Sequence, residues 1–265
     1  MLIDTHCHLD FDRFDEDRNE VVSRMITAGV KRVIVPALDP DNWHAVLDLA
    51  DQYDSVYAAV GVHPNSCAGW TDEWINTLEQ KASHPKVVAI GEIGLDYYWN
   101  RAPQDVQRHA FALQLGLAAK LNLPVIVHNR ESDRDVLSAL AACELAGKDD
   151  PGVLHSFSGD RSIAREALAM GYCLGFTGPV TYKNAVETRH VAAMVAEEKT
   201  LIETDAPFLA PQQHRGRRNE PAYVTLVAEK IAEVRQVSPE LIAEQTTRNA
   251  RRLFGDMGLT KDHSR

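Results

Sequence analysis

The chain has 265 residues, of which 45% are hydrophobic and 25% are charged, and this composition excludes an intrinsically disordered, fibrous or collagen-like chain. No apolar run reaches the ~18 residues that a membrane-spanning helix needs, and the first residues lack the features of a signal peptide. We therefore expect a cytoplasmic protein with no membrane partner and no obligate protein partner. The net charge of −10 argues against a large basic surface for nucleic acid, although a bound cation can reverse the potential locally.

Short apolar or β-branched segments alternate along the chain with segments of helical spacing. We expect eight strands, at residues 2–6, 32–37, 56–60, 87–91, 124–128, 152–155, 172–176 and 200–204. We expect helices between them at 16–28, 43–51, 71–81, 103–121, 133–146, 162–170 and 184–196, and two final helices at 220–235 and 239–254.

This alternation predicts parallel β-α units, and eight such units predict a (β/α)8 TIM barrel with its active site at the C-terminal ends of the strands. We assign residues 1–255 to this single domain and residues 256–265 to a polar tail. A doubly wound open sheet is the alternative, but the glycine-rich fingerprints that bind nucleotides in such sheets are missing from the sequence.

The first predicted strand ends in a His-x-His sequence. His6 and His8 are two residues apart and therefore share one face of an extended strand, where two imidazoles can bind one divalent ion. Cys7 lies on the opposite face. The four cysteines of the chain are far apart and form no Cys-x-x-Cys pair, so we expect free thiols.

More histidines and carboxylates occur where later strands end. They are His63, Glu92, His128, His155 and Asp205. Together with His6 and His8, five of the eleven histidines and two acids therefore collect at one end of the predicted barrel. One such histidine alone is more often a hydrogen-bonded core residue, but burying the whole set without a cation would be costly. Nitrogen and carboxylate ligands suit zinc, manganese or magnesium, and seven groups suit two ions bridged by Glu92.

Arginine is concentrated after the last predicted strand. Arg215, Arg217 and Arg218 lie within four positions, and Arg130 follows the fifth strand. Guanidinium groups bind phosphate in a bidentate manner, so we expect these four residues to bind substrate; a solvated loop with ion pairs is the alternative. Three aromatic residues at 97–99 follow the fourth strand and could either stack on a base or pack as a lid.

The ordered series of these motifs resembles the TatD family of metal-dependent deoxyribonucleases from residue 2 to about residue 255. The motifs are Asp4-Thr5-His6-Cys7-His8-Leu9, Gly61-Val62-His63-Pro64, Gly91-Glu92-Ile93-Gly94-Leu95-Asp96, His128 with Arg130, His155-Ser156-Phe157-Ser158-Gly159, Glu203-Thr204-Asp205-Ala206-Pro207 and Arg215-Gly216-Arg217-Arg218-Asn219-Glu220-Pro221. The resemblance implies a (β/α)8 barrel with two metal ions. It implies that His6, His8, Glu92 and Asp205 hold one ion and that Glu92, His128 and His155 hold the other.

The resemblance and these features together predict a magnesium- or manganese-dependent deoxyribonuclease that acts as an exonuclease on short or single-stranded DNA, with zinc as the alternative to magnesium or manganese. Asp205 would accept a proton from the attacking water, Glu92 would bridge the ions, and His63 would orient or protonate the phosphate. Glu203 would orient a metal ligand. The alternatives are a two-metal hydrolase of an ester, amide or lactone, such as an aminoacyl-tRNA ester, and an inactive metal-bound scaffold.

Overall fold

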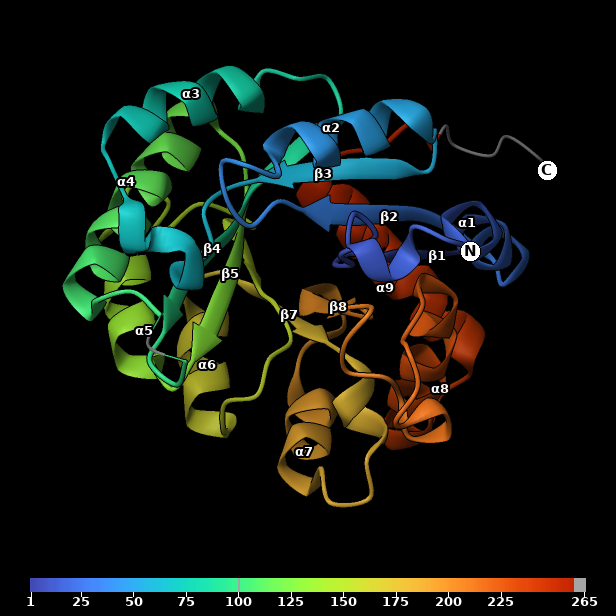
Figure 1. The fold of residues 1–265 in the computed structure, drawn as a ribbon. Coiled ribbons are helices and arrows are strands. Elements are labelled where there is room, and N and C mark those ends of the chain that lie inside the picture. Colours follow the sequence, from blue (N-terminus) through green and yellow to red (C-terminus); the bar gives the residue numbers. More distant parts are fainter. Residues whose placement is uncertain (100, 260–265) are drawn as a thin grey trace.

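The computed structural model, which describes residues 1–99 and 101–259, confirms the predicted (β/α)8 barrel (Figure 1). Eight parallel strands pair in the order in which they occur along the chain. They are β1 (Leu2–Asp4), β2 (Val30–Pro36), β3 (Val56–Val60), β4 (Val87–Asp96), β5 (Val125–Arg130), β6 (Gly152–Leu154), β7 (Cys173–Phe176) and β8 (Thr200–Ile202).

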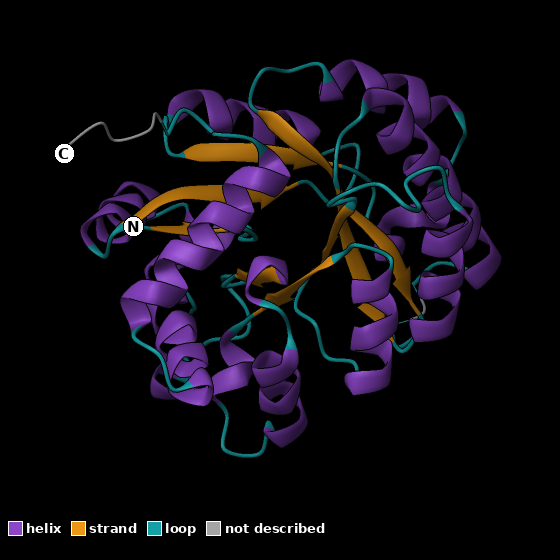
Figure 2. Cartoon of the chain, turned by 180° about the vertical axis from the view of Figure 1, so that it is seen from behind, coloured by secondary structure: helices purple, strands orange, loops and turns teal. Residues whose placement is uncertain are grey.

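The helices form the outer ring of the barrel (Figure 2). They are α1 (Arg18–Thr27), α2 (Trp43–Gln52), α3 (Glu73–Ala82), α4 (Gln104–Leu121), α5 (Asp133–Ala142), α6 (Arg161–Ala169), α7 (Val186–Met194), α8 (Val224–Arg235) and α9 (Pro239–Phe254). Short 3-10 turns lie at η1 (Asp12–Phe14), η2 (Pro64–Gly69), η3 (Gly178–Thr181), η4 (Glu197–Lys199), η5 (Gln212–His214) and η6 (Pro221–Tyr223). In the described residues no helix is long and apolar enough to cross a membrane.

Several element boundaries differ from the prediction, and two of the larger differences have identifiable reasons. The helix expected at 220–235 begins at Val224, because Pro221 starts a separate 3-10 turn. The helix expected at 133–146 ends at Ala142. The strand expected at 87–91 continues to Asp96, because its second half stays paired with β5 up to Arg130. Of the predicted tail, residues 260–265 lie outside the described part of the chain.

Segments that follow the first and last strands bring the two ends of the sheet together. The amide of Asp205 donates to the carbonyl of His6 at 2.8 Å, and the amide of His8 donates to the carbonyl of Ala206 at 2.7 Å. Cys7 and Ala206 form a parallel bridge between the two segments. Because these segments include candidate site residues, the contacts that close the barrel also position the site.

The barrel interior is apolar below the site. A buried cluster contains at least one residue from each strand, side chains of α9, and Met257 just after it: Ile3, Ile34, Ala59, Val88, Ala89, Ile126, Val153, Cys173, Leu201, Ala250, Leu253, Phe254 and Met257. Helix α9 therefore covers the end of the barrel away from the histidines. A second, larger cluster fills the layer between the strands and the surrounding helices, so the strands are buried on both faces, as expected for a parallel sheet.

Candidate metal centre

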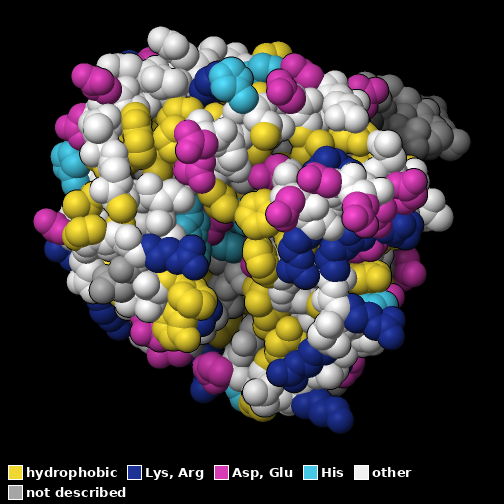
Figure 3. All heavy atoms as spheres, viewed as in Figure 1, with side chains coloured by type: hydrophobic (Ala, Val, Ile, Leu, Met, Phe, Trp, Pro, Cys, Tyr) yellow, Lys and Arg dark blue, Asp and Glu magenta, His cyan; other side chains and the backbone are white. Residues whose placement is uncertain are grey.

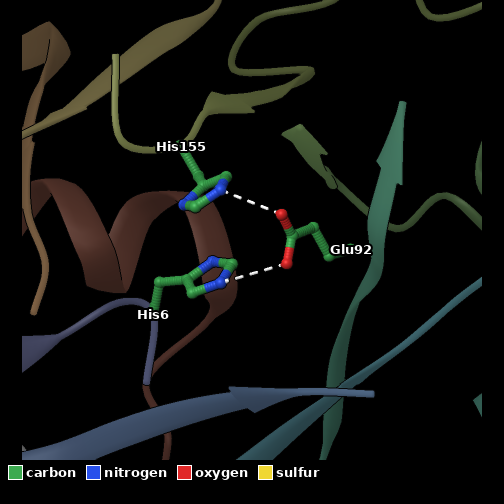
Figure 4. Close-up of side chains that lie close together, drawn as sticks. All are labelled: His6, Glu92 and His155. Atoms are coloured by element: carbon green, nitrogen blue, oxygen red, sulfur yellow. Dashed lines mark ion pairs between the residues drawn. The ribbon is translucent and has the colours of Figure 1, made fainter. Parts of the chain in front are cut away.

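The side chain of Glu92 lies between two groups of histidines at the C-terminal end of the barrel. Glu92 belongs to β4 and is 2% exposed. Its Oε2 atom lies 3.3 Å from Nε2 of His6, and its Oε1 atom lies 2.9 Å from Nε2 of His155 (Figure 4). Oε1 also lies 2.8 Å from Nδ1 of His128. The two carboxylate oxygens thus face different sets of imidazoles.

The first set contains the two histidines that follow β1 and the aspartate that follows β8. Nε2 of His6 lies 3.3 Å from Nε2 of His8, and Oδ1 of Asp205 lies 3.7 Å and 3.5 Å from these two nitrogens. Two ligands bound at about 2.1 Å to one tetrahedral or octahedral ion have donor atoms about 3.0–3.4 Å apart. The two nitrogens are 3.3 Å apart and fall in this range, while Oδ1 of Asp205, at 3.5 and 3.7 Å, would have to move slightly closer for the three groups to hold one divalent cation.

The second set consists of Glu92, His128, His155 and His63. His63 differs from the others, because its Nδ1 atom accepts a hydrogen bond from the amide of Asn65 at 3.0 Å. In a neutral imidazole the other nitrogen then carries the proton. That Nε2–H group lies 3.6 Å from Oε1 of Glu92, so His63 presents a hydrogen-bond donor to the site rather than a free lone pair.

Two further buried carboxylates lie behind these histidines, and that of Asp96 is hydrogen-bonded to one of them. Oε2 of Glu203, which is fully buried, lies 3.6 Å from Nδ1 of His155 and accepts the amide of Ser156 at 2.9 Å. Gly175 makes room for it, since a Cβ atom there would lie 2.1 Å from Oε1 of Glu203. Oδ2 of Asp96 lies 3.0 Å from Nε2 of His128. Carboxylates in this position fix the orientation of metal-binding imidazoles.

The buried charges interact strongly with one another. Burial disfavours the charged form of Glu92, but the positive fields of His155, His6 and His63 outweigh burial and hold its pKa well below the usual value. For His8, burial is outweighed by the hydrogen bond and charge of Asp205, and the pKa is raised. Burial, reinforced by the charge of His128, lowers the pKa of His63 to about 3. A negative carboxylate thus lies among imidazoles, only some of which favour the protonated form.

The site opens to solvent through a cavity of about 510 Å³. This volume lies within the range of small-molecule sites, about 300–1,000 Å³. Figure 3 shows histidine side chains at the base of the hollow, with hydrophobic and basic side chains around it. Of the seven candidate side chains, all but His6 line the cavity: His8, His63, Glu92, His128, His155 and Asp205.

Sequence reasoning missed several residues that line the same cavity or support it. Asn65, Asp96, Arg101 and Phe208 all line it. The motif that begins at Gly91 ends with Asp96 and could have indicated a functional residue there. The strand periodicity, however, did not predict that its side chain contacts a histidine. Asn65 lies in η2, and Arg101 and Phe208 lie in loops whose path the sequence does not determine.

The arginines predicted to bind substrate lie outside the lining of this cavity. Arg218 is engaged elsewhere: its guanidinium pairs with Asp17 at 2.7 Å and with Glu220 at 3.0 Å, and it covers the ring of Phe14. Arg215 and Arg217 are exposed, and Arg130 is exposed with its guanidinium over Tyr98. The structure thus gives Arg218 a structural ion-pair role, as in the alternative interpretation of this loop.

Comparisons with known proteins agree with this geometry. Residues 3–255 match a family model described as TatD related DNase. The chain is 42% identical to the uncharacterized metal-dependent hydrolase YabD of Bacillus subtilis, over 96% of this chain and 99% of that protein. It is 39% identical to the uncharacterized metal-dependent hydrolase TatD of Mycobacterium tuberculosis, over 96% of this chain and 98% of that protein. The crystal structure of YjjV, a TatD homologue from Escherichia coli, superposes with a TM-score of 0.89 at 35% identity, over 96% of this chain and 97% of that one.

Proposed function

Because this chain belongs to the TatD family of metal-dependent hydrolases, we propose that it is a two-metal deoxyribonuclease that cleaves phosphodiester bonds of short or single-stranded DNA from an exposed end. The observation that carries this proposal is the position of Glu92. One buried carboxylate has one oxygen toward His6 and the other toward His155 and His128. With such a shared carboxylate the chain would be able to hold two divalent ions, which would stabilise the charge of a phosphoryl group.

The ligand sets follow from the two faces of Glu92. His6, His8 and Asp205 would complete the first ion site, and His128 and His155 the second. The two carboxylates and a phosphate substrate suit magnesium or manganese, whereas the four imidazoles suit zinc.

The remaining chemistry belongs to residues of the chain. Bound divalent ions would polarise a phosphoryl oxygen and lower the pKa of a water molecule. Asp205 lines the cavity and its carboxylate would accept the proton of that water. His63 would orient the phosphate by donating from Nε2, since its other nitrogen already accepts a hydrogen bond from Asn65. This geometry favours the role in which His63 orients the phosphate over the role in which His63 protonates it. Arg130, Arg215 and Arg217 would contribute at most longer-range attraction to the DNA.

An activity screen tests this proposal. The protein is supplied with magnesium, manganese or zinc and offered single-stranded DNA, duplex DNA, RNA, aminoacyl-tRNA and small esters, with a chelator in parallel. We expect metal-dependent turnover of single-stranded DNA that Glu92→Gln abolishes. Glu79→Gln is the matched control, because Glu79 pairs with Lys120 on the outer surface. If the protein hydrolysed the carboxylic esters but no DNA, the bond it cleaves would be a carboxylic ester and not a phosphodiester.

A further inference from the structure

We infer that the loop between β4 and α4 presents Trp99 as a stacking platform for a nucleobase at the mouth of the metal centre, so that the enzyme recognises an unpaired nucleotide rather than the phosphodiester backbone alone. The inference rests on the proposed function and specifies the substrate that the site would take. Trp99 is 56% exposed and lines the cavity that contains Glu92. A large apolar ring exposed at the entrance of a polar site is typical of a ligand contact.

The loop that carries Trp99 is held in place by buried hydrogen bonds. Oδ1 of Asp96 accepts the amides of Tyr98 at 3.1 Å and Trp99 at 2.9 Å. The side chain of Gln107, fully buried on α4, bonds both the amide and the carbonyl of Asp96 and also the carbonyl of Ala102. Since Asp96 also contacts His128, the same carboxylate connects the platform to the metal centre. The backbone that carries the Trp99 ring is thus held in a fixed position relative to the site.

A second aromatic wall comes from the other side of the barrel. Phe208, which follows β8, is 44% exposed and lies 5.7 Å from Phe11 between ring centroids, and both rings line the same cavity. In the strand order β4 and β8 lie on opposite sides of an eight-stranded barrel. The phosphate-binding centre therefore lies between aromatic walls, which suits a flat base on either side of the scissile bond.

Arginines accompany these exposed rings. Arg101 lies over Trp99 at 5.6 Å, and Arg13 lies over Phe208 at 6.0 Å. The cations offer counter-charges to phosphates that flank a stacked base, and Figure 3 shows basic side chains on both sides of the hollow. Alternating aromatic and cationic groups are how proteins bind single strands without reading sequence. Charge complementarity thus favours a single-stranded nucleic acid as the occupant over an apolar peptide.

Binding of two matched oligonucleotides tests the platform. The probes are a fluorescently labelled, phosphorothioate-linked thymidine oligonucleotide and an abasic oligonucleotide with the same backbone, measured by fluorescence polarisation with the manganese-loaded protein. We expect Trp99→Ala to weaken binding of the thymidine probe roughly tenfold and to leave binding of the abasic probe almost unchanged. Trp99→Phe, which keeps an aromatic face, should restore most of the affinity. Tyr98→Ala is the control, since Tyr98 is similarly exposed but outside the described lining of the cavity.

Three results would overturn the inference: equal affinity of wild type and Trp99→Ala for the thymidine probe, equal loss for both probes, or a loss in Tyr98→Ala as large as in Trp99→Ala. Because Trp99 is exposed, each variant should remain folded, which circular dichroism checks. The outcome is separate from that of the activity screen. A protein that cleaves single-stranded DNA but binds both probes alike would retain the proposed function and lose the platform. A protein that discriminates between the probes but cleaves neither DNA nor RNA would retain the platform and lose the proposed function.

Discussion

Asp205 is the residue on which the proposed chemistry depends most directly. It lies at the end of the β8 segment with a φ of 55°, a left-handed conformation that Asp and Asn tolerate better than most residues. We therefore predict that Asp205→Asn folds normally but lowers kcat about 10²–10⁴-fold, because an amide does not accept the proton and is a poorer ligand. Nuclease turnover at saturating manganese measures the effect, and calorimetry counts the bound metal.

Glu203→Gln is the matched comparison, since Glu203 lies behind His155, accepts hydrogen bonds from Ser156 and Thr5, and does not line the cavity. Its effect on kcat should be smaller. Near wild-type turnover of a folded Asp205→Asn protein would remove Asp205 from the mechanism. Turnover that recovers only at high manganese would keep Asp205 as a ligand and move proton acceptance to another residue.

Arg218 forms an ion pair that its residue type and local sequence do not predict. Its partner Asp17 is 201 residues away in the sequence, so the ion pair that occupies it could not be expected from local pattern. We predict that Arg218→Ala lowers stability by about 1 kcal/mol, or roughly 2–3 °C in Tm, because this pair is partly exposed and screened by solvent. Thermal unfolding at pH 7 gives the value, and Arg217→Ala, at an exposed neighbour, should leave Tm unchanged.

The same ion pair has a defined pH dependence. The hydrogen bond and charge of Arg218 lower the pKa of Asp17 from 3.8 to about 2. A carboxyl whose pKa is lowered by folding stabilises the protein above its unfolded pKa and loses that contribution as pH falls through the folded value. The difference in Tm between wild type and Arg218→Ala should thus be constant above about pH 5 and shrink toward pH 2. A constant difference across this range would show that Arg218 acts through its packing on Phe14 instead.

At the scale of elements, helix α4 fixes two of the loops that carry site residues. Gln107 and Gln114 are both buried on α4, two turns apart. Gln114 bonds the amide and carbonyl of Val62, beside His63, as Gln107 bonds those of Asp96. A glutamine in each place therefore satisfies backbone groups where β3 and β4 leave the barrel.

We predict that Gln107→Ala destabilises the protein by about 2 kcal/mol, because it leaves buried backbone groups of Asp96 unpaired. It should also weaken binding of the thymidine oligonucleotide more than that of its abasic counterpart, since the Trp99 loop loses its anchor. Gln114→Ala supplies the control: a similar loss of stability in urea unfolding, with unchanged discrimination between the probes. If both variants discriminated equally well, preorganisation of the loop by Gln107 would have no part in binding.

The elements also show what could be predicted from sequence. Alternating patterns predicted the eight strands, and parallel topology then placed His6, Glu92 and His155 at one end of the barrel without any knowledge of distances. The length of β4 could not be predicted, because Gly91 and Gly94 suggest a loop. Gly94 in fact serves close strand packing, since a Cβ atom there would lie 2.0 Å from the carbonyl of His128. Contacts such as those of Gln107 depend on where loops run, which periodicity does not specify.

At the scale of the whole molecule, the candidate metal centre and barrel closure are one structure. His6 and His8 follow the first strand and Asp205 follows the last, and backbone hydrogen bonds join these two segments. An ion held by these side chains would therefore link the two ends of the sheet, which are far apart along the chain. Metal binding and global stability should consequently be coupled, because the unfolded chain cannot bring the ligands together.

We predict that a chelator lowers Tm and that manganese at about 100 times its Kd raises it by about 5 °C, since binding at that excess contributes about 2.7 kcal/mol. Glu92→Gln should abolish most of this shift, because Glu92 faces both donor sets, whereas Glu79→Gln should keep it. Differential scanning calorimetry with and without manganese, magnesium or zinc provides the measurement. A Tm that none of the three metals changes would contradict metal binding at this centre, whereas a shift that survives in Glu92→Gln would place the stabilising ion on His6, His8 and Asp205 alone.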